Sequence, residues 1–152
     1  MKKLKIQNLK PGLVKGVEVM LPQKEAYRET YFEWKETTLI AKFATHNVSG
    51  GTLQAWHHQP LFKEAENHID AEMFYFISGT ALMMFIDYKK GIPDLKTAQV
   101  VRILPGTKII IAQGKGHFVP VAEGDVPVSV VVVAPKMDAP RAALSEPILG
   151  IL

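Results

Sequence analysis

The sequence predicts an all-β fold, a single-domain jelly-roll β-barrel, and three observations support this. Runs rich in Val, Ile, Phe, Tyr and Thr recur along the 152 residues, and these residue types suit the pleated surface of a sheet. The 10 prolines and 11 glycines interrupt those runs at short intervals. No repeat or linker composition divides the chain, so one domain is expected over residues 1–152.

The expected strands are short, and residues that favour turns separate them. Ser78-Gly79 and Leu104-Pro105-Gly106, for example, contain residues that tolerate a positive φ or fix φ near the value of proline. The strands are expected at Gly16–Met20, Glu29–Glu36, Thr38–Ala44, Thr52–His57, Met73–Ser78, Ala81–Tyr88, Gln99–Leu104, Lys108–Ala112, His117–Val121 and Val128–Ala134.

One short peripheral helix is expected near the C-terminal end. Asp138 is a suitable cap, Pro140 fits a first helical turn, and residues 141–144 are adequate helix formers.

Composition excludes several classes of protein. Hydrophobic residues make up 47% and charged residues 22%, which is typical of a folded soluble domain. The net charge of +3 comes partly from a lysine-rich start and forms no basic patch, so nucleic acid is not expected as a partner. The longest apolar run, Val126–Ala134, is about half the ~20 residues of a membrane helix, and the basic start precedes no apolar signal segment. A cytoplasmic location without membrane association is therefore expected.

Polar side chains gather ahead of one apolar strand. Glu66, His68, Asp70 and Glu72 share one parity, so an extended backbone directs all four to the same face. His117 begins another apolar strand. Burial of these groups is costly unless they are paired or bound to a cation, and the chain contains no cysteine. Two histidines and a carboxylate are the nitrogen and oxygen ligands of Zn, Mn, Ni or Fe centres.

These residues fall at the spacing of two motifs, and the chain resembles the cupin superfamily in both. In the first motif a glutamate follows a histidine and a glycine comes later, as in His68, Glu72 and Gly79; the second is matched by Gly106, Gly114 and His117. The resemblance implies a cupin-type jelly-roll barrel with its motif-bearing core at about 52–135. The chain departs from the motifs at three positions, which hold Glu66 for a histidine, Ala112 for a proline and Val121 for an asparagine.

Among cupins, residues 63–120 are most similar to the ureidoglycolate lyase family. The likeness rests on Glu66-Asn67-His68, on Pro93-Asp94-Leu95-Lys96-Thr97 and on His117-Phe118-Val119-Pro120. It implies an enzyme that cleaves a ureido-acid, a small anionic substrate, to glyoxylate and urea. His68 and His117 would then bind a divalent metal or the substrate carboxylate, and Glu72 would be the third ligand or, without metal, the general base.

Several alternatives stay open at this point. Glu66 is a candidate fourth ligand, and so is either His57 or His58, which an extended strand would direct to opposite faces. The same triad would serve an isomerase or an Fe(II) dioxygenase. A cupin that binds a small ligand without catalysis, or a barrel whose polar residues only satisfy one another, would also retain the pattern.

Other residues carry weaker signals. The run Met73–Phe76 and the run Met83–Phe85 are apolar on both faces, which favours burial on both sides and a homodimer. Alternation along Tyr31–Trp34 favours a strand in the core or in a dimer interface. Lys115 is expected in an exposed turn, with contact to an anionic substrate as the alternative, and His46 is expected in a loop.

Overall fold

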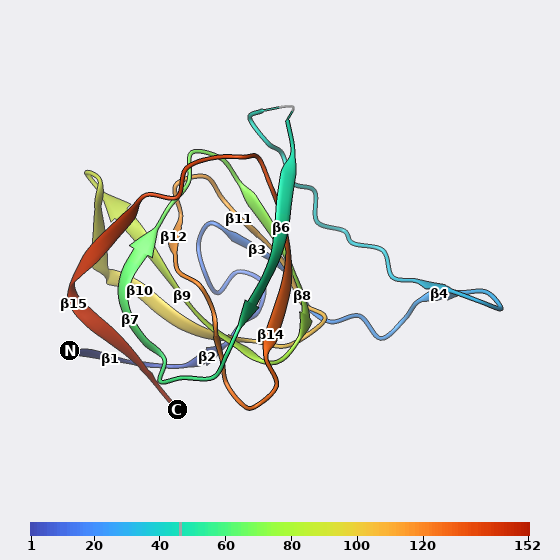
Figure 1. Cartoon of the computed structure of the whole chain (residues 1–152), viewed down its shortest axis with the longest axis horizontal. Coiled ribbons are helices and arrows are strands. Elements are labelled where there is room, and N and C mark those ends of the chain that lie inside the picture. Colours follow the sequence, from blue (N-terminus) through green and yellow to red (C-terminus); the bar gives the residue numbers. More distant parts are fainter. Residues whose placement is uncertain (46) are drawn as a thin grey trace.

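The computed structural model describes residues 1–45 and 47–152, and every regular element in that part of the chain is a β-strand. Two sheets enclose most of the barrel, with a small hairpin outside it (Figure 1). This agrees with the all-β prediction. His46, expected in a loop, lies outside the described residues.

The larger sheet has eight strands. Its order is β1 (Lys2–Lys5), β15 (Arg141–Ile151), β7 (Leu61–Glu66), β12 (Gly116–His117), β9 (Ala81–Lys89), β10 (Ile92–Ile103) and β2 (Gln7–Asn8), and β13 (Val121–Ala122) also pairs with β9. The second sheet has the order β3 (Val17–Met20), β11 (Lys108–Ile111), β8 (Glu72–Ser78), β14 (Val128–Ala134) and β6 (Ser49–Ala55).

Alternate residues of β8 and β9 face different cores. Phe74 and Phe76 of β8 pack in the barrel interior with Met83 and Phe85 of β9. The opposite face of β9, including Met84, is covered by residues of β7 and β15. The opposite face of β8, including Met73, packs beneath residues 39–43. The predicted burial of both faces is confirmed, but the chain itself supplies both covers, and the homodimer stays a prediction.

The expected strands agree best with the structure where motifs and apolar runs coincide. β8, β9, β11 and β14 lie within a residue or so of their expected bounds, whereas β10 begins well before Gln99. The expected strands Glu29–Glu36 and Thr38–Ala44 are wrong. The first is a hairpin of two-residue strands, β4 (Tyr27–Arg28) and β5 (Glu33–Trp34), and residues 38–44 belong to no strand. β1, β7 and β15 lie in regions for which no strand was predicted.

The expected helix after Asp138 is wrong, because residues 141–151 form β15. This strand pairs with β7 on one side and β1 on the other, and it buries Leu144 and Ile148 against the larger sheet. Pairing of two otherwise open edges and burial of apolar side chains outweigh the weak local preference for helix. Among the described residues, no helix has the length and apolarity to cross a membrane.

Candidate metal centre

Three strands bring the polar residues of both motifs together. Glu66 is the last residue of β7, and His117 of β12 lies directly opposite it in the antiparallel register. Neighbours in such a register share one face, so both side chains point into the barrel. Glu72 begins β8, and His68 lies in the connection from β7 to β8.

The four side chains converge on one point. Nε2 of His117 lies 3.0 Å from Oε2 of Glu72, and Nε2 of His68 lies 3.3 Å from the same oxygen. Oε1 of Glu66 is 3.9 Å from Nε2 of His68 and 4.0 Å from Nε2 of His117. Glu66, His68 and His117 each offer one ligand atom, and these atoms lie within 4.8 Å of one another.

A hydrogen bond at Nδ1 of each imidazole fixes the tautomer of the ring. Nδ1 of His68 lies 3.0 Å from the carbonyl oxygen of Asp138, and Nδ1 of His117 lies 3.2 Å from the carbonyl oxygen of Lys115. A carbonyl oxygen only accepts hydrogen bonds, so each Nδ1 carries the donated proton. In the neutral imidazoles both Nε2 atoms therefore present lone pairs to the carboxylates.

Two polar atoms at the centre of this arrangement have no partner in the part of the chain that the structure describes. Among the described residues, Nε2 of His68 and Oε2 of Glu72 are buried and have no hydrogen-bond partner. Lone pairs that face a carboxylate repel one another unless a proton or a metal ion lies between them. Imidazoles held by carbonyl groups at Nδ1 are typical of metal-binding histidines. The residues present therefore fit a divalent cation.

The cluster is nearly closed to solvent. The side chains of His117, His68, Glu72 and Glu66 are 2%, 7%, 11% and 15% exposed. The carbonyl of Asp138, in the connection from β14 to β15, covers the outer side of His68. Glu66 is the most exposed of the four side chains.

Two further residues lie on the Glu66 side. Nε of Arg141 is 3.7 Å from Oε2 of Glu66, and its guanidinium also lies over the ring of Phe118. The hydroxyl of Tyr88 donates to the carbonyl of Ala65. Burial, and then the charge of Glu66, raise the pKa of Tyr88 above its usual value. Neither residue is a site candidate from the sequence, which predicts only the end of a strand at Tyr88 and a helix at Arg141.

Asp70 does not join the cluster, although it shares the parity of its neighbours. Its carboxylate accepts hydrogen bonds from the backbone amides of Ala44, Thr45 and Ala71. The amide of Ala44 is the largest cause of a lowered pKa for Asp70. The parity argument assumed a straight strand, whereas the chain bends between Glu66 and Glu72. Asp70 instead anchors residues 44–45 beside the barrel.

The other candidate residues also lie outside the cluster. His57 and His58 are exposed, and their Nδ1 atoms lie against the carbonyls of Ala122 and Gln59, so neither histidine is the fourth ligand. Lys115 is buried, and its Nζ forms an ion pair with Asp87 at 2.7 Å. The expectation of an exposed turn lysine is therefore wrong, because Asp87 compensates its charge.

Comparisons with known proteins agree with this fold. No protein-family model and no curated protein sequence matches the chain. The structure is similar to that of a dTDP sugar isomerase from Desulfovibrio desulfuricans, with a TM-score of 0.57 and 10% identity over 87% of each chain. This likeness concerns the fold alone, and it agrees with the all-β barrel predicted from the sequence.

Weaker matches include two structures of Bacillus subtilis oxalate decarboxylase, one of them described in terms of its Mn(II) centres. Each has a TM-score of 0.46 and 18% identity over 64% of this chain. This chain spans 24% of the length of those proteins.

Proposed function

We propose that this chain is a small-molecule enzyme of the cupin type that holds one divalent cation with His68, His117 and Glu72. The convergence of two imidazole lone pairs on one buried carboxylate oxygen without a hydrogen-bond partner carries this proposal. Glu66 is either a fourth ligand or the group that exchanges a proton with substrate. Imidazole and carboxylate ligands suit Zn, Mn, Ni or Fe.

The expected substrate is a small anion. A bound cation would supply positive charge that orients a substrate carboxylate and stabilises developing negative charge. Arg141 adds a second positive charge beside Glu66, and its side chain is 54% exposed. Both charges favour a compact acid over a neutral ligand.

The finer proposal is a lyase that resembles ureidoglycolate lyase, and the sequence likeness over residues 63–120 is its support. In such a reaction a hydroxyl proton passes to a carboxylate and the oxygen forms a carbonyl. The adjacent carbon–nitrogen bond breaks, the nitrogen takes up a proton, and glyoxylate and urea separate. Glu66 suits the proton transfer because it is the most exposed carboxylate of the cluster and lies farther from the imidazoles than Glu72 does.

The metal is tested first, with elemental analysis of the purified protein and calorimetric titration of the metal-free protein with Mn²⁺, Zn²⁺, Ni²⁺ and Fe²⁺. We expect one site per chain that His117→Ala abolishes and that His57→Ala, a matched change at an exposed histidine, leaves intact. Wild-type protein that binds none of these ions would overturn the proposal.

Activity is tested next, by assay of glyoxylate release from ureidoglycolate. Glu66→Gln keeps the size of the side chain and removes its charge. If Glu66 transfers a proton, this variant retains the metal and loses turnover. If Glu66 is a ligand, the variant loses both. Oxygen uptake that depends on Fe²⁺ would favour a dioxygenase, and substrate interconversion without cleavage would favour an isomerase. Ligand binding without turnover would favour a binding protein.

A further inference from the structure

A single turn contacts both histidines of the cluster. Residues 112–115 form this turn, which connects β11 to β12. The amide of Gly114 donates a hydrogen bond to the backbone carbonyl of His68 at 2.9 Å. The carbonyl oxygen of Lys115 accepts the hydrogen bond from Nδ1 of His117 at 3.2 Å. The turn therefore places the backbone of one histidine and the ring of the other.

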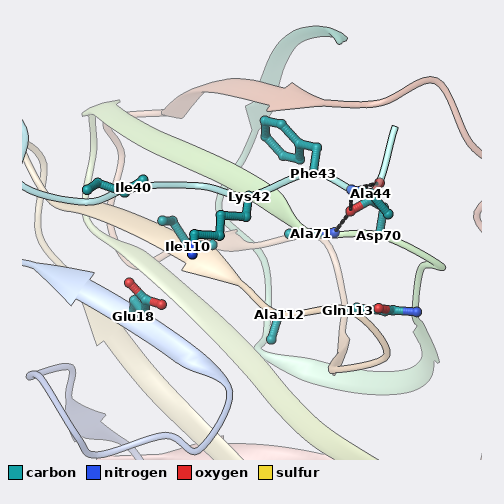
Figure 2. Close-up of a pocket in the computed structure, with 10 residues that line it drawn as sticks. All are labelled: Glu18, Ile40, Lys42, Phe43, Ala44, Asp70, Ala71, Ile110, Ala112 and Gln113. Atoms are coloured by element: carbon teal, nitrogen blue, oxygen red, sulfur yellow. Dashed lines mark hydrogen bonds between the residues drawn. The ribbon is translucent and has the colours of Figure 1, made fainter. Parts of the chain in front are cut away.

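Two cavities adjoin the turn. Figure 2 shows Ala112 and Gln113 at the lower edge of the first, below Asp70. This cavity has a volume of about 510 Å³, and a second one of about 380 Å³ is lined by Gly114 and Lys115. A segment bordered by cavities has few packing contacts to hold it in place. Its polar contacts must then supply most of the restraint.

The strongest of these contacts is the side chain of Lys115, which ties the turn to β9. This side chain is 5% exposed, and its Nζ lies 2.7 Å from Oδ1 of Asp87. His117 pairs with Phe85 of β9, so Lys115 and Asp87, each two residues away along the chain, extend the same face. An ammonium group this deeply buried is stable only beside an opposite charge.

Asp87 is itself held in place. Its amide donates to Oγ1 of Thr97 at 2.8 Å, and that hydroxyl donates to the carbonyl of Asp94 at 2.8 Å. The side chain of Asp87 is 43% exposed, so its carboxylate is also stable in water. The buried ammonium of Lys115 is not, and without its partner the flexible side chain would turn out to solvent. The backbone of the turn would move with it.

The ring of His117 depends on the position of that backbone. Each ring nitrogen faces an acceptor, the carbonyl of Lys115 at Nδ1 and Oε2 of Glu72 at 3.0 Å from Nε2. A neutral imidazole has one proton for the two nitrogens. With the proton on Nδ1, the lone pair of Nε2 is free for a cation. If the carbonyl moves away, the proton passes to Nε2, Glu72 accepts it, and the lone pair is lost.

We propose, on the basis of the metal centre proposed above, that Lys115 and Asp87 are its positioning residues. Their ion pair holds the carbonyl of residue 115 against His117 and so keeps the ring proton on Nδ1. The same turn holds the backbone of His68 through Gly114, so one anchor serves both histidines.

The tautomer of His117 is tested first, by ¹⁵N NMR of the metal-free protein at alkaline pH. We expect the proton on Nδ1 in wild type and on Nε2 in Asp87→Asn and in Lys115→Met. Asp87→Glu keeps the charge at a position with room for a longer side chain and should restore the wild-type tautomer. The control, Glu123→Gln, breaks an ion pair near the other end of β9 and should change nothing.

Two results of the NMR measurement would overturn the proposal. One is a wild-type ring with its proton on Nε2. The other is a wild-type tautomer retained in both Asp87→Asn and Lys115→Met. An ion pair that only stabilises the fold would give this second result, with a lower midpoint of thermal unfolding and an unchanged ring.

The affinity for metal is tested next, by calorimetric titration of the same proteins with Zn²⁺ and Mn²⁺. We expect Asp87→Asn and Lys115→Met each to weaken binding about 10–100-fold, as is usual when a group that orients a metal ligand is lost. The double variant should bind no more weakly than either single one, because the two residues act as a unit. Asp87→Glu and Glu123→Gln should bind as wild type does. Circular dichroism verifies that each variant is folded.

The two measurements separate the role of the ion pair from the metal centre itself. Wild-type protein that binds neither ion would overturn the metal centre, while the tautomers would still test the pair. Tight binding by wild type and equally tight binding by Asp87→Asn and Lys115→Met would overturn the role of the pair and leave the metal centre intact.

Discussion

The polar cluster of the barrel and the hairpin of residues 21–38, the arm, are opposite exceptions to the usual distribution of residues in a folded protein. The cluster buries four ionisable side chains in the barrel, with His117 only 2% exposed. The arm exposes four aromatic side chains, with Tyr31 at 95%. Buried charges and exposed aromatic clusters both cost free energy in an isolated chain.

The two exceptions differ in kind, since one concerns polar groups and the other apolar surface. In the cluster, two imidazole nitrogens face one buried carboxylate oxygen, an arrangement that fits a cation. The arm instead leaves four aromatic side chains in contact with solvent. Variants that change one region and spare the other test the two regions separately.

The largest expected difference in stability is between two Phe→Ala substitutions, one in the barrel core and one in the arm. Phe76→Ala, at a side chain 1% exposed in the barrel core, should lower the free energy of unfolding by about 3–5 kcal/mol. Phe32→Ala in the arm should change it by less than about 0.5 kcal/mol in dilute monomer. Urea denaturation at low protein concentration measures both. Similar losses would mean that the arm packs on its own barrel.

The next effect is the stability gained from metal. At a free concentration of 100 times Kd, a bound ion stabilises the fold by about 2.7 kcal/mol. His117→Ala should abolish this gain, and Tyr31→Ser in the arm should preserve it. Thermal unfolding with and without Mn²⁺ or Zn²⁺ measures the gain. A gain that survives His117→Ala would place the ion elsewhere.

Asp70 joins the two regions, because it ties residues 44–45, at the end of the segment that returns from the arm, to the connection that bears His68. Asp70→Ala leaves the amides of Ala44, Thr45 and Ala71 without their acceptor and should lower the stability of the fold. Asp70→Asn keeps one oxygen acceptor and should cost less. Hydrogen exchange should accelerate at the amides of Ala44 and Thr45. Unchanged exchange there would contradict the anchoring role.

The smallest effect on stability is expected at the partly exposed ion pair between Arg102 and Glu123, outside both regions. The side-chain hydrogen bond from Arg102 is the largest cause of a lowered pKa for Glu123. Since the pKa is lower in the folded state, the stabilisation is present above the unfolded value of 4.5 and is lost as pH falls through the folded value. Glu123→Gln should remove about 1 kcal/mol at neutral pH.

The pH dependence of unfolding provides the check on Glu123. Wild type should lose more stability than Glu123→Gln between neutral and acidic pH, as measured by urea denaturation at several pH values. Glu25→Gln, in the exposed arm, is the matched control. Parallel pH profiles for wild type and Glu123→Gln would contradict the role of the Arg102 pair.

The candidate site was predicted in part. Motif spacing selected His68, Glu72 and His117, and shared parity added Glu66; all four lie together in the structure. Parity failed for Asp70, since the connection from β7 to β8 is bent and its polar groups follow local amides rather than a pleat. Arg141 escaped notice because its place beside Glu66 depends on the pairing of β15 with β7, almost 80 residues away along the chain.

The sequence by itself determined the strands of the barrel core and the identity of the ligand candidates. Alternating apolar side chains and fixed motif spacing are local patterns that survive in any fold that buries them. Tertiary structure alone decided three features: residues 141–151 form a strand, the outer faces of β8 and β9 are covered by the chain itself, and the arm remains outside. Each depends on which distant sheet edge or apolar face is left open, and that competition is settled only when the whole chain has folded.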